Sequence, residues 1–343
     1  MCYGGFIKMT YLERHKNEIF KKFTDEELLN DIDSYKNGKG KLNKVLNHFF
    51  EECIFNCKGG RGAKTPMEAL QDEESMERIL GAIKKSPKLY YSDDEITNVK
   101  KFFSMAGRIA QKVANFCPQN AKDIYFRYFP EALTNTKNKL NILDTSCGFG
   151  SRMSAVLLNG HNYYGFDPNI KLQEQLVKCA KFYKTHNLID SKQKCALYCS
   201  GSEQFHSELE NTIDVSFTSP PYFNLEKYSD DNSASTINYN NYQLWIDEFV
   251  KPTIENTYKY LKVGGYAMIN IKNLTTKGKQ TLFDDWFAIF KSIDGFEFVE
   301  TFDMKHQHKR TFNGKHATIS DDEYLGFKEP VMVFKKIKNT KTN

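Results

Sequence analysis

The fold is decided by one stretch of the chain, Ile213-Asp214-Val215-Ser216-Phe217-Thr218-Ser219-Pro220-Pro221-Tyr222. Residues with strand character run directly into a polar residue, two prolines and an aromatic ring. Proline cannot donate a hydrogen bond to a sheet, and it holds the residue before it in an extended conformation. The strand must therefore end at Thr218 or Ser219, and the turn after it is stiff. Open α/β sheets bind their ligands at such turns, outside the carboxyl ends of the strands.

This turn offers a ligand the hydroxyl of Ser219, the carbonyl of Pro220 and the ring of Tyr222. An amino group on an aromatic base is a poor nucleophile, because its lone pair is delocalised into the ring. Two acceptors that pull on its hydrogens make the nitrogen more tetrahedral and release the lone pair, while an aromatic side chain stacks on the base. The turn is therefore suited to transfer onto an exocyclic amine. The alternative is an ordinary Ser-Pro-Pro surface turn.

A glycine-rich loop follows an earlier strand, which we expect at 140–143. The loop reads Asp144-Thr145-Ser146-Cys147-Gly148-Phe149-Gly150-Ser151-Arg152. Glycines let the backbone approach a ligand closely, and the helix expected from Ser151 to Leu158 offers free N–H groups. A dinucleotide fingerprint would need a third glycine near the position of Met153. The loop thus departs from the nicotinamide-binding pattern.

A second strand, expected at 163–167, ends in Asp167. Its spacing from Gly148 is that at which a carboxylate accepts hydrogen bonds from the hydroxyls of a ribose. A carboxylate in this place can also be a simple helix cap. The glycine loop and the acid together favour the ribose contact.

The motif Ser219-Pro220-Pro221-Tyr222 resembles that of the S-adenosylmethionine-dependent DNA amino-methyltransferases, which modify N4 of cytosine or N6 of adenine. The sequence around it is similar to small methylases of phages and prophages, and the resemblance covers roughly residues 115–336. It implies that Ser219, Pro220, Pro221 and Tyr222 are catalytic. Ser219 and Pro220 would polarise the amine of a base flipped out of the duplex, and Tyr222 would stack on that base.

The resemblance also implies S-adenosylmethionine as the cofactor. The segment that contains Phe116 and Pro118 is similar to the one that packs over the methionine end of the cofactor, and the loop at 200–203 is similar to the adenine-side loop. Ser146 stands where the family usually has glycine. The expected cofactor contacts are Phe116, Pro118, Asp144, Ser146, Gly148, Gly150, Asp167 and Ser202.

The expected fold is α/β, a Rossmann-like sheet of seven strands as in the methyltransferases, with a helical N-terminal domain. The domains are expected at 1–105 and 106–338. Beyond the strands named above, we expect an amphipathic helix at 242–260, its cap at 261–265, and further strands, which lie at 195–199, 266–271, 296–302 and 331–335.

The N-terminal hundred residues are expected to be mostly helical. Thr24 and Glu27 form a capping box, Pro66 opens a helix through Leu80, and another helix runs from Ser92 through Ala114. Basic glycine loops at 36–41 and 58–65 suit either contacts with DNA phosphates or solvated turns. Recognition of DNA would then fall to these helices and to the loops at 229–241 and 303–328.

Composition permits these interpretations without requiring them. The 343 residues carry a net charge of +5, which is compatible with nucleic acid as a partner. The cysteines lack metal-binding spacing, and no apolar run is long enough to span a bilayer. We therefore expect no metal, no membrane association, a cytoplasmic location, and a monomer or homodimer. His306, His308 and His316 suggest a phosphate contact or a solvated hairpin.

The acceptor and the activity stay open at this point. Serine at position 219 leans toward cytosine N4 within the family. RNA or a protein glutamine also offers a planar amine, although enzymes for these acceptors generally carry Asn or Asp in place of Ser219. The same fold would also suit a non-catalytic DNA-binding protein, or an enzyme that installs a group bulkier than methyl.

Overall fold

The structure is a computed structural model that describes residues 20, 22–59, 64–85, 103–135, 137–223, 239, 241–273, 281–304 and 329–339. Most of the loop expected at 229–241 lies outside the described residues. So do nearly all of the loop at 303–328, with its histidines, and the centre of the second basic loop.

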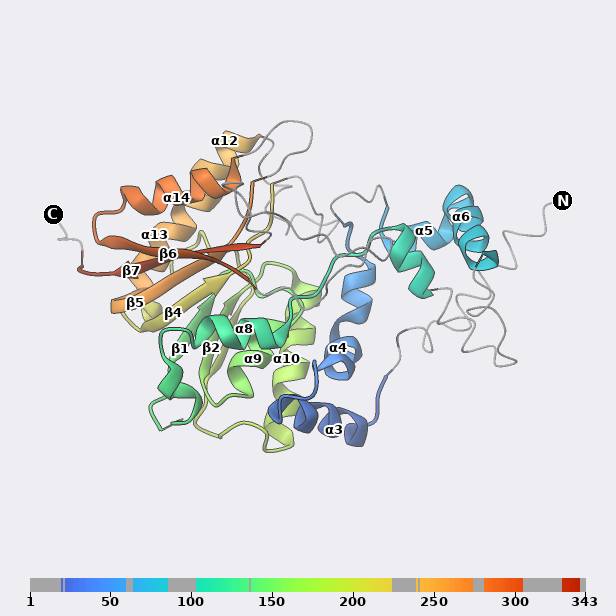
Figure 1. Ribbon diagram of the computed structural model, residues 1–343, viewed down its shortest axis with the longest axis horizontal. Coiled ribbons are helices and arrows are strands. Elements are labelled where there is room, and N and C mark those ends of the chain that lie inside the picture. The colour runs from blue at the N-terminus through green and yellow to red at the C-terminus, as the bar shows by residue number, and fades with distance from the viewer. Residues whose placement is uncertain are drawn as a thin grey trace, which may run out of the picture.

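A seven-stranded sheet forms the centre of the molecule, in the order β3-β2-β1-β4-β5-β7-β6 (Figure 1). Five neighbouring strands from β3 to β5 are parallel, and β7 runs antiparallel to both β5 and β6. The predicted Rossmann-like α/β fold is confirmed. The strands are β1 (Asn141–Asp144), β2 (Asn162–Phe166), β3 (Cys195–Tyr198), β4 (Ile213–Thr218), β5 (Leu261–Asn270), β6 (Phe296–Asp303) and β7 (Pro330–Lys336).

The strand order creates a switch point between β1 and β4. The chain moves outward from β1 to β2 and β3, and then returns to place β4 on the other side of β1. Ile142 pairs with Val215 and Leu143 with Ser216, so these two strands end side by side. The glycine loop after β1 and the Ser-Pro-Pro-Tyr turn after β4 therefore start from neighbouring strand ends, where such sheets bind ligands.

Helices cover both faces of the sheet. On one face lie α8 (Pro118–Tyr125), α9 (Ser151–Leu157) and α10 (Ile170–Thr185), and on the other lie α13 (Lys251–Tyr260) and α14 (Leu282–Ser292) (Figure 1). Successive strand residues belong to different buried clusters: Ile142 packs on the α8–α10 side and Leu143 on the α13–α14 side. Most residues of β1 and β4 are accordingly buried, as expected for strands covered on both faces.

The structure corrects three expected boundaries. The helix expected from Pro66 through Leu80 is two helices, α5 (Pro66–Gln71) and α6 (Glu73–Lys84), because Asp72 is extended and its carboxylate accepts a hydrogen bond from the N–H of Ser75. The helix before β5 contains a π-helical stretch, Ile246–Val250, between α12 (Tyr242–Trp245) and α13. The helix expected to end at Ala114 is helical only to residue 109.

β5 begins at Leu261, five residues before the start that we expected at Tyr266. Residues 261–265, which we expected to cap the preceding helix, are part of the strand. Gly264 adopts a φ of +90°, and the pairing with β4 shifts register between Ile213 and Val215. A bulge of this kind can be accommodated by glycine without steric cost, so the glycines mark an irregular strand and not its limit.

The first two described helices, α3 (Asp25–Lys36) and α4 (Asn43–Phe55), share one buried cluster with α8, α9 and α10. The predicted capping box at Thr24 and Glu27 is confirmed. By contrast, α5 and α6 pack with Phe20, Phe55 and Phe103 in a separate cluster. The domain boundary at residue 105 stays a prediction. Among the described residues, no helix has both the length and the apolar character that crossing a membrane requires.

Candidate functional site

The glycine loop between β1 and α9 has the backbone that its sequence predicts. Gly148 and Gly150 have φ values of +56° and +72°, in the left-handed region that other residues avoid. A Cβ at Gly148 would be in ordinary van der Waals contact with Nη2 of Arg152, at 3.7 Å, so neighbouring atoms do not crowd this position. A Cβ at Gly150 would lie 2.3 Å from Cζ of Phe50, so this glycine is enclosed by α4.

A buried ion pair supports the loop from within. Nε of Arg152 donates to Oδ2 of Asp144 at 2.8 Å, Nη2 donates to Oδ1 at 3.3 Å, and Nη2 also donates to the carbonyl of Ser146. The hydroxyl of Tyr163 donates to Asp144 Oδ2 at 2.9 Å. Asp144 is completely buried, so its carboxylate stabilises the loop. A direct contact between Asp144 or Ser146 and a cofactor stays a prediction.

Arg152 was not expected to be part of the site. Burial lowers the pKa of its guanidinium, but the charge of Asp144 and the hydrogen bonds to it outweigh burial and raise the pKa above its usual value. The guanidinium also lies over the ring of Phe116, 5.4 Å from the ring centroid. The sequence did carry a signal for the Asp144–Arg152 pair, because an acid precedes the glycine loop and an arginine directly follows it.

Asp167 lies at the end of β2, beside the glycine loop. Its carboxylate accepts hydrogen bonds from the backbone N–H of Asn169, at 3.0 Å, and of Gly148. Burial raises the pKa of Asp167 to about 7, although both hydrogen bonds oppose the rise. The cap of α10 is the side chain of Asn169, which accepts from the N–H of Leu172 at 3.1 Å. Asp167 is therefore not the cap that its position in the sequence also allowed.

The segment before α8 is joined to the glycine loop through Asn115. Its amide donates to the carbonyl of Phe149 at 3.2 Å and accepts from the hydroxyl of Ser151 at 2.7 Å. Phe116 makes an edge contact with Phe217 of β4, with ring centroids 5.6 Å apart. Pro118 is buried at the start of α8. The structure thus brings this predicted segment to the switch point.

Ser202 is held by α13. Its hydroxyl shares a hydrogen bond of 2.9 Å with Thr253, and its carbonyl accepts from Asn256 at 3.1 Å. The hydroxyl is thus bonded to the helix and keeps the capacity to accept a further hydrogen bond. The predicted role of Ser202 toward the cofactor stays a prediction.

The Ser-Pro-Pro-Tyr turn is held by the end of the neighbouring strand β5. β4 ends at Thr218, as the prolines predicted. The hydroxyl of Ser219 donates to Oδ1 of Asn270 at 3.5 Å, and the hydroxyl of Tyr222 accepts from the N–H of Lys272 at 3.1 Å. Pro220 is buried, whereas Pro221 is half-buried.

Asn270 and Lys272 were also not expected at the site. Asn270 is buried and donates to the carbonyl of Pro330 at 3.0 Å, and the ammonium of Lys272 pairs with Glu329 at 3.0 Å. Asn270 ends β5 and Lys272 follows it, and the position of this strand beside β4 was not evident from the sequence. These bonds attach the turn to both β5 and the start of β7.

Two hydroxyls at the switch point have no hydrogen bond to any described residue. They belong to Thr145, which directly follows β1, and to Thr218, which ends β4, and both are buried. Buried polar groups normally have a partner in the native state. The unsatisfied pair marks the ends of β1 and β4 as a place where a polar ligand would gain hydrogen bonds.

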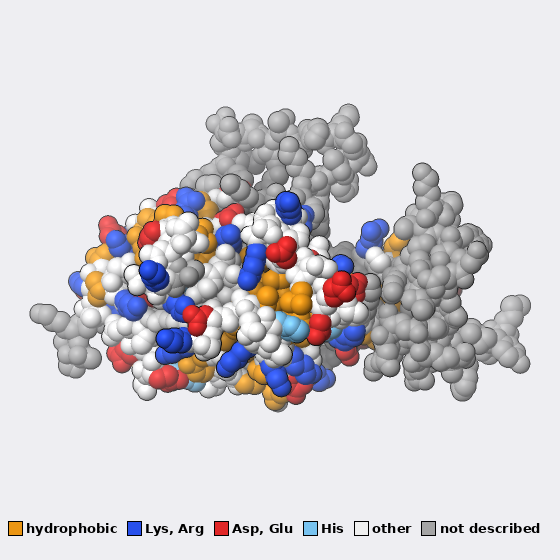
Figure 2. All heavy atoms as spheres, turned by 90° about the horizontal axis from the view of Figure 1, so that it is seen from below, with side chains coloured by type: hydrophobic (Ala, Val, Ile, Leu, Met, Phe, Trp, Pro, Cys, Tyr) orange, Lys and Arg blue, Asp and Glu red, His pale blue; other side chains and the backbone are white. Residues whose placement is uncertain are grey.

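No group of three or more His, Cys, Asp or Glu side chains is positioned to hold a metal ion in the part of the chain that is described. On the face seen from below, Lys and Arg side chains are mixed with Asp and Glu and are not gathered into one basic patch (Figure 2). This mixture is consistent with the modest net charge of +5.

Comparisons with known proteins return neither a family model nor a curated sequence that matches the chain. Solved structures do match, at low identity. An O-methyltransferase from Thermotoga maritima has a TM-score of 0.41 at 10% identity, covering 67% of this chain and 69% of its own. The tRNA (m1A58) methyltransferase TrmI of Aquifex aeolicus has a TM-score of 0.40 at 12% identity, covering 66% and 72%. The N-methyltransferase NodS of Bradyrhizobium japonicum, in complex with S-adenosylhomocysteine, has a TM-score of 0.39 at 10% identity, covering 64% and 86%.

Proposed function

We propose that this chain is an S-adenosylmethionine-dependent methyltransferase whose acceptor is the exocyclic amine of cytosine or adenine in DNA. The observation that carries the proposal is the placement of two motifs at neighbouring strand ends. The glycine loop with Asp167 beside it occupies the ends of β1 and β2, and the Ser-Pro-Pro-Tyr turn follows the adjacent strand β4. One motif suits a nucleoside and the other a planar amine, so together they suit transfer between the two.

The residues present fit the cofactor. The left-handed glycine Gly148 would let the backbone approach the cofactor, the carboxylate of Asp167 beside it would accept hydrogen bonds from the ribose hydroxyls, and Phe116 beside the loop would pack on the methionine end. When bound, the cofactor supplies a methyl group on a sulfonium, an electrophile that needs no metal.

The chain's own residues prepare the amine. The hydroxyl of Ser219 donates toward Asn270, so its lone pairs are left to accept a hydrogen from the substrate amine. The carbonyl of Pro220 is the second acceptor, and the ring of Tyr222 stacks on the base. The amine polarised by these residues would accept the methyl group that the cofactor supplies, and its extra proton would leave the nitrogen afterwards. No strong general base is required.

DNA as the acceptor is supported by the form of the motif, because Ser-Pro-Pro-Tyr is a form found in the DNA enzymes that this sequence resembles. A base within a duplex has to be flipped out to reach the turn. The experiment is to express the full chain in a host that lacks such modifications, and to digest its DNA and RNA to nucleosides for mass spectrometry. Binding of S-adenosylhomocysteine to the purified chain is measured in parallel by calorimetry.

We expect N4-methylcytosine or N6-methyladenine in the DNA, and neither with Ser219→Ala, which should bind S-adenosylhomocysteine as the wild type does. Methylation confined to RNA would overturn the DNA assignment. Binding without any modified nucleoside, in the host or in added DNA, would overturn the acceptor class. Absence of binding would overturn the whole proposal.

A further inference from the structure

The N-terminal helix α4 contacts the region that we assign to the cofactor. We propose that α4 closes the cofactor site beside the glycine loop, with Phe50 as the residue that positions Gly150. This inference rests on the proposed function, because it assumes that the cofactor binds at that loop. It gives the N-terminal part of the chain a role in cofactor binding, in addition to the DNA recognition predicted from the sequence.

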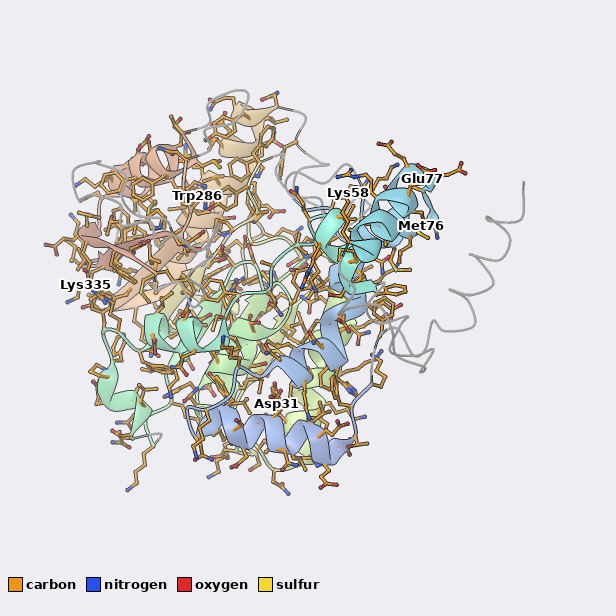
Figure 3. The ribbon with its side chains drawn as sticks, turned by 45° about the vertical axis from the view of Figure 1, so that its right-hand side comes forward. Asp31, Lys58, Met76, Glu77, Trp286 and Lys335 are labelled. Atoms are coloured by element: carbon orange, nitrogen blue, oxygen red, sulfur yellow. The ribbon has the colours of Figure 1, made fainter. Side chains whose placement is uncertain are left out.

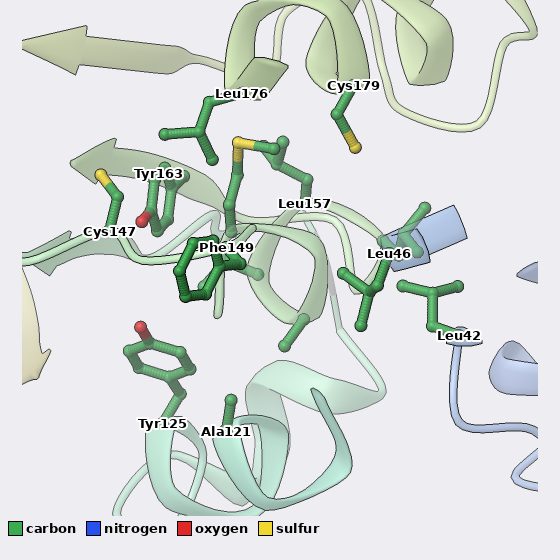
Figure 4. Packing of buried hydrophobic residues seen from close by; sticks show 14 of the residues in the cluster. Leu42, Leu46, Ala121, Tyr125, Cys147, Phe149, Leu157, Tyr163, Leu176 and Cys179 are labelled. Carbon is green, nitrogen blue, oxygen red and sulfur yellow. The ribbon is translucent and has the colours of Figure 1, made fainter. Parts of the chain in front are cut away.

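Phe50 lies directly against the loop. Its ring is fully buried and occupies the place of a side chain at Gly150, where a Cβ would be 2.3 Å from Cζ and 2.4 Å from Cε2. Gly150 is also the N-cap of α9 and has a left-handed backbone. The ring therefore limits the conformations that the loop can adopt on this side. Leu42 and Leu46 extend the same packing to Leu157 of α9 (Figure 4).

Cys53 lies one helical turn after Phe50 and packs, partly buried, against the same cluster. Burial raises the pKa of the Cys53 thiol to about 11, and the negative charge of Asp167 adds to the rise. By its packing, α4 lies against one expected cofactor contact, Gly150, and against α10, which begins just after another, Asp167.

The helix is held firmly in this position. The carboxylate of Asp31 on α3 accepts hydrogen bonds from the N–H groups of Lys44, at 2.7 Å, and Val45, at 3.1 Å, at the start of α4 (Figure 3). This contact replaces the missing side-chain cap of α4. Phe49 packs on Phe182 of α10, with centroids 5.9 Å apart, and α10 begins just after Asp167.

Truncation of Phe50 would therefore leave a void behind the loop and permit conformations that do not bind the cofactor. A site whose competent conformation is less populated binds its ligand more weakly by the same factor. Loss of packing elsewhere on α4 would lower stability without this effect on binding. That difference separates a positioning role from a merely structural one.

The test measures binding of S-adenosylhomocysteine to the full chain by calorimetry, with thermal unfolding of each variant. Phe50→Ala should weaken binding by about tenfold. Phe50→Leu, which refills most of the void, should restore most of the affinity. The matched control is Phe55→Ala: this ring is on the same helix and 3% exposed, but it packs in the separate cluster with Phe20 and Phe103. The control should lose stability and keep wild-type affinity.

Equal affinities for Phe50→Ala and Phe55→Ala would overturn the positioning role of Phe50. If the wild type binds no S-adenosylhomocysteine, the proposed function itself fails, which is a distinguishable result.

If Phe50→Ala does not fold, the proposal is tested instead by alkylating the cysteines of the wild type with N-ethylmaleimide. Saturating S-adenosylhomocysteine should slow alkylation of Cys53 severalfold and leave unchanged that of Cys195, at the opposite end of the sheet. An unchanged rate at Cys53 would overturn the closure by α4.

Discussion

The two halves of the sheet's carboxyl edge are built differently. On the cofactor side, a buried ion pair, two left-handed glycines and the ring of Phe50 support one loop. On the acceptor side, the turn has a weak hydrogen bond from Ser219 to Asn270 and one from Lys272 to Tyr222, and its stiffness comes from two prolines. The loop proposed for the cofactor is therefore supported by buried charge and close packing, whereas the Ser-Pro-Pro-Tyr turn combines two prolines with hydrogen bonds to Asn270 and Lys272 at the end of β5.

The largest expected effect is at the buried ion pair. Arg152→Met leaves Asp144 charged, buried and without its cation, which should lower the free energy of unfolding by about 3–5 kcal/mol. The control is Arg127→Met, which breaks a pair with Glu300 that has similar geometry, with Nε–Oε1 at 3.0 Å, but is largely exposed. That change should cost at most about 1 kcal/mol. Chemical denaturation measures the free energy of unfolding of both variants. Equal losses would show that the buried pair at the glycine loop contributes no more to stability than the exposed pair.

The second expected effect is a pH dependence at Asp167. Ribose hydroxyls donate to the charged carboxylate, and the pKa of Asp167 in the free protein is about 7. Affinity for S-adenosylhomocysteine should therefore fall as the pH decreases from about 8 to about 6, approaching about tenfold per unit below the pKa. Asp167→Asn should bind weakly with no such dependence, and Asp190→Asn, at an exposed loop, should keep the wild-type profile. A flat wild-type profile would contradict the ribose role.

Stability should change with pH in the opposite sense. The pKa of Asp167 in the folded state is above the unfolded value of about 3.9. Between these values the folded state holds a proton that the unfolded chain has lost, so the contribution of this group to stability declines as the pH rises toward 7. Asp167→Asn should consequently melt at a higher temperature than the wild type at about pH 8. A lower melting temperature would mean that the carboxylate is stabilising in the free protein.

The smallest expected effect is at Asn270. Asn270→Ala removes the acceptor that orients the Ser219 hydroxyl, and it should lower the methyl-transfer rate severalfold while leaving affinity for S-adenosylhomocysteine unchanged. The bond is 3.5 Å long, which limits the loss. Asn273→Ala is the control, because this side chain lies just after β5 but bonds with Asp284 and the N–H of Phe283. Equal rates for the two variants would remove Asn270 from the mechanism.

Local chemistry was sufficient to place several features. Proline ends β4 wherever the strand lies in the sheet, and left-handed conformations favour glycine, so the turn at 219–222 and the loop at 144–150 were predictable. The Thr24–Glu27 capping box also involves only neighbours in the chain. The start of β5 was missed, because glycines that resemble a helix cap serve a bulge once β4 is beside them.

The partners of these features were decided in three dimensions. Nothing within the loop indicates that Phe50, about a hundred residues earlier, occupies the space beside Gly150, or that Asn270 lies next to Ser219. Such contacts depend on strand order and helix packing, which join segments distant in the chain. Backbone preferences act between neighbours in the sequence, whereas burial, ion pairing and cavity filling act between neighbours in space. The motifs are therefore legible in the sequence, and their supports only in the folded chain.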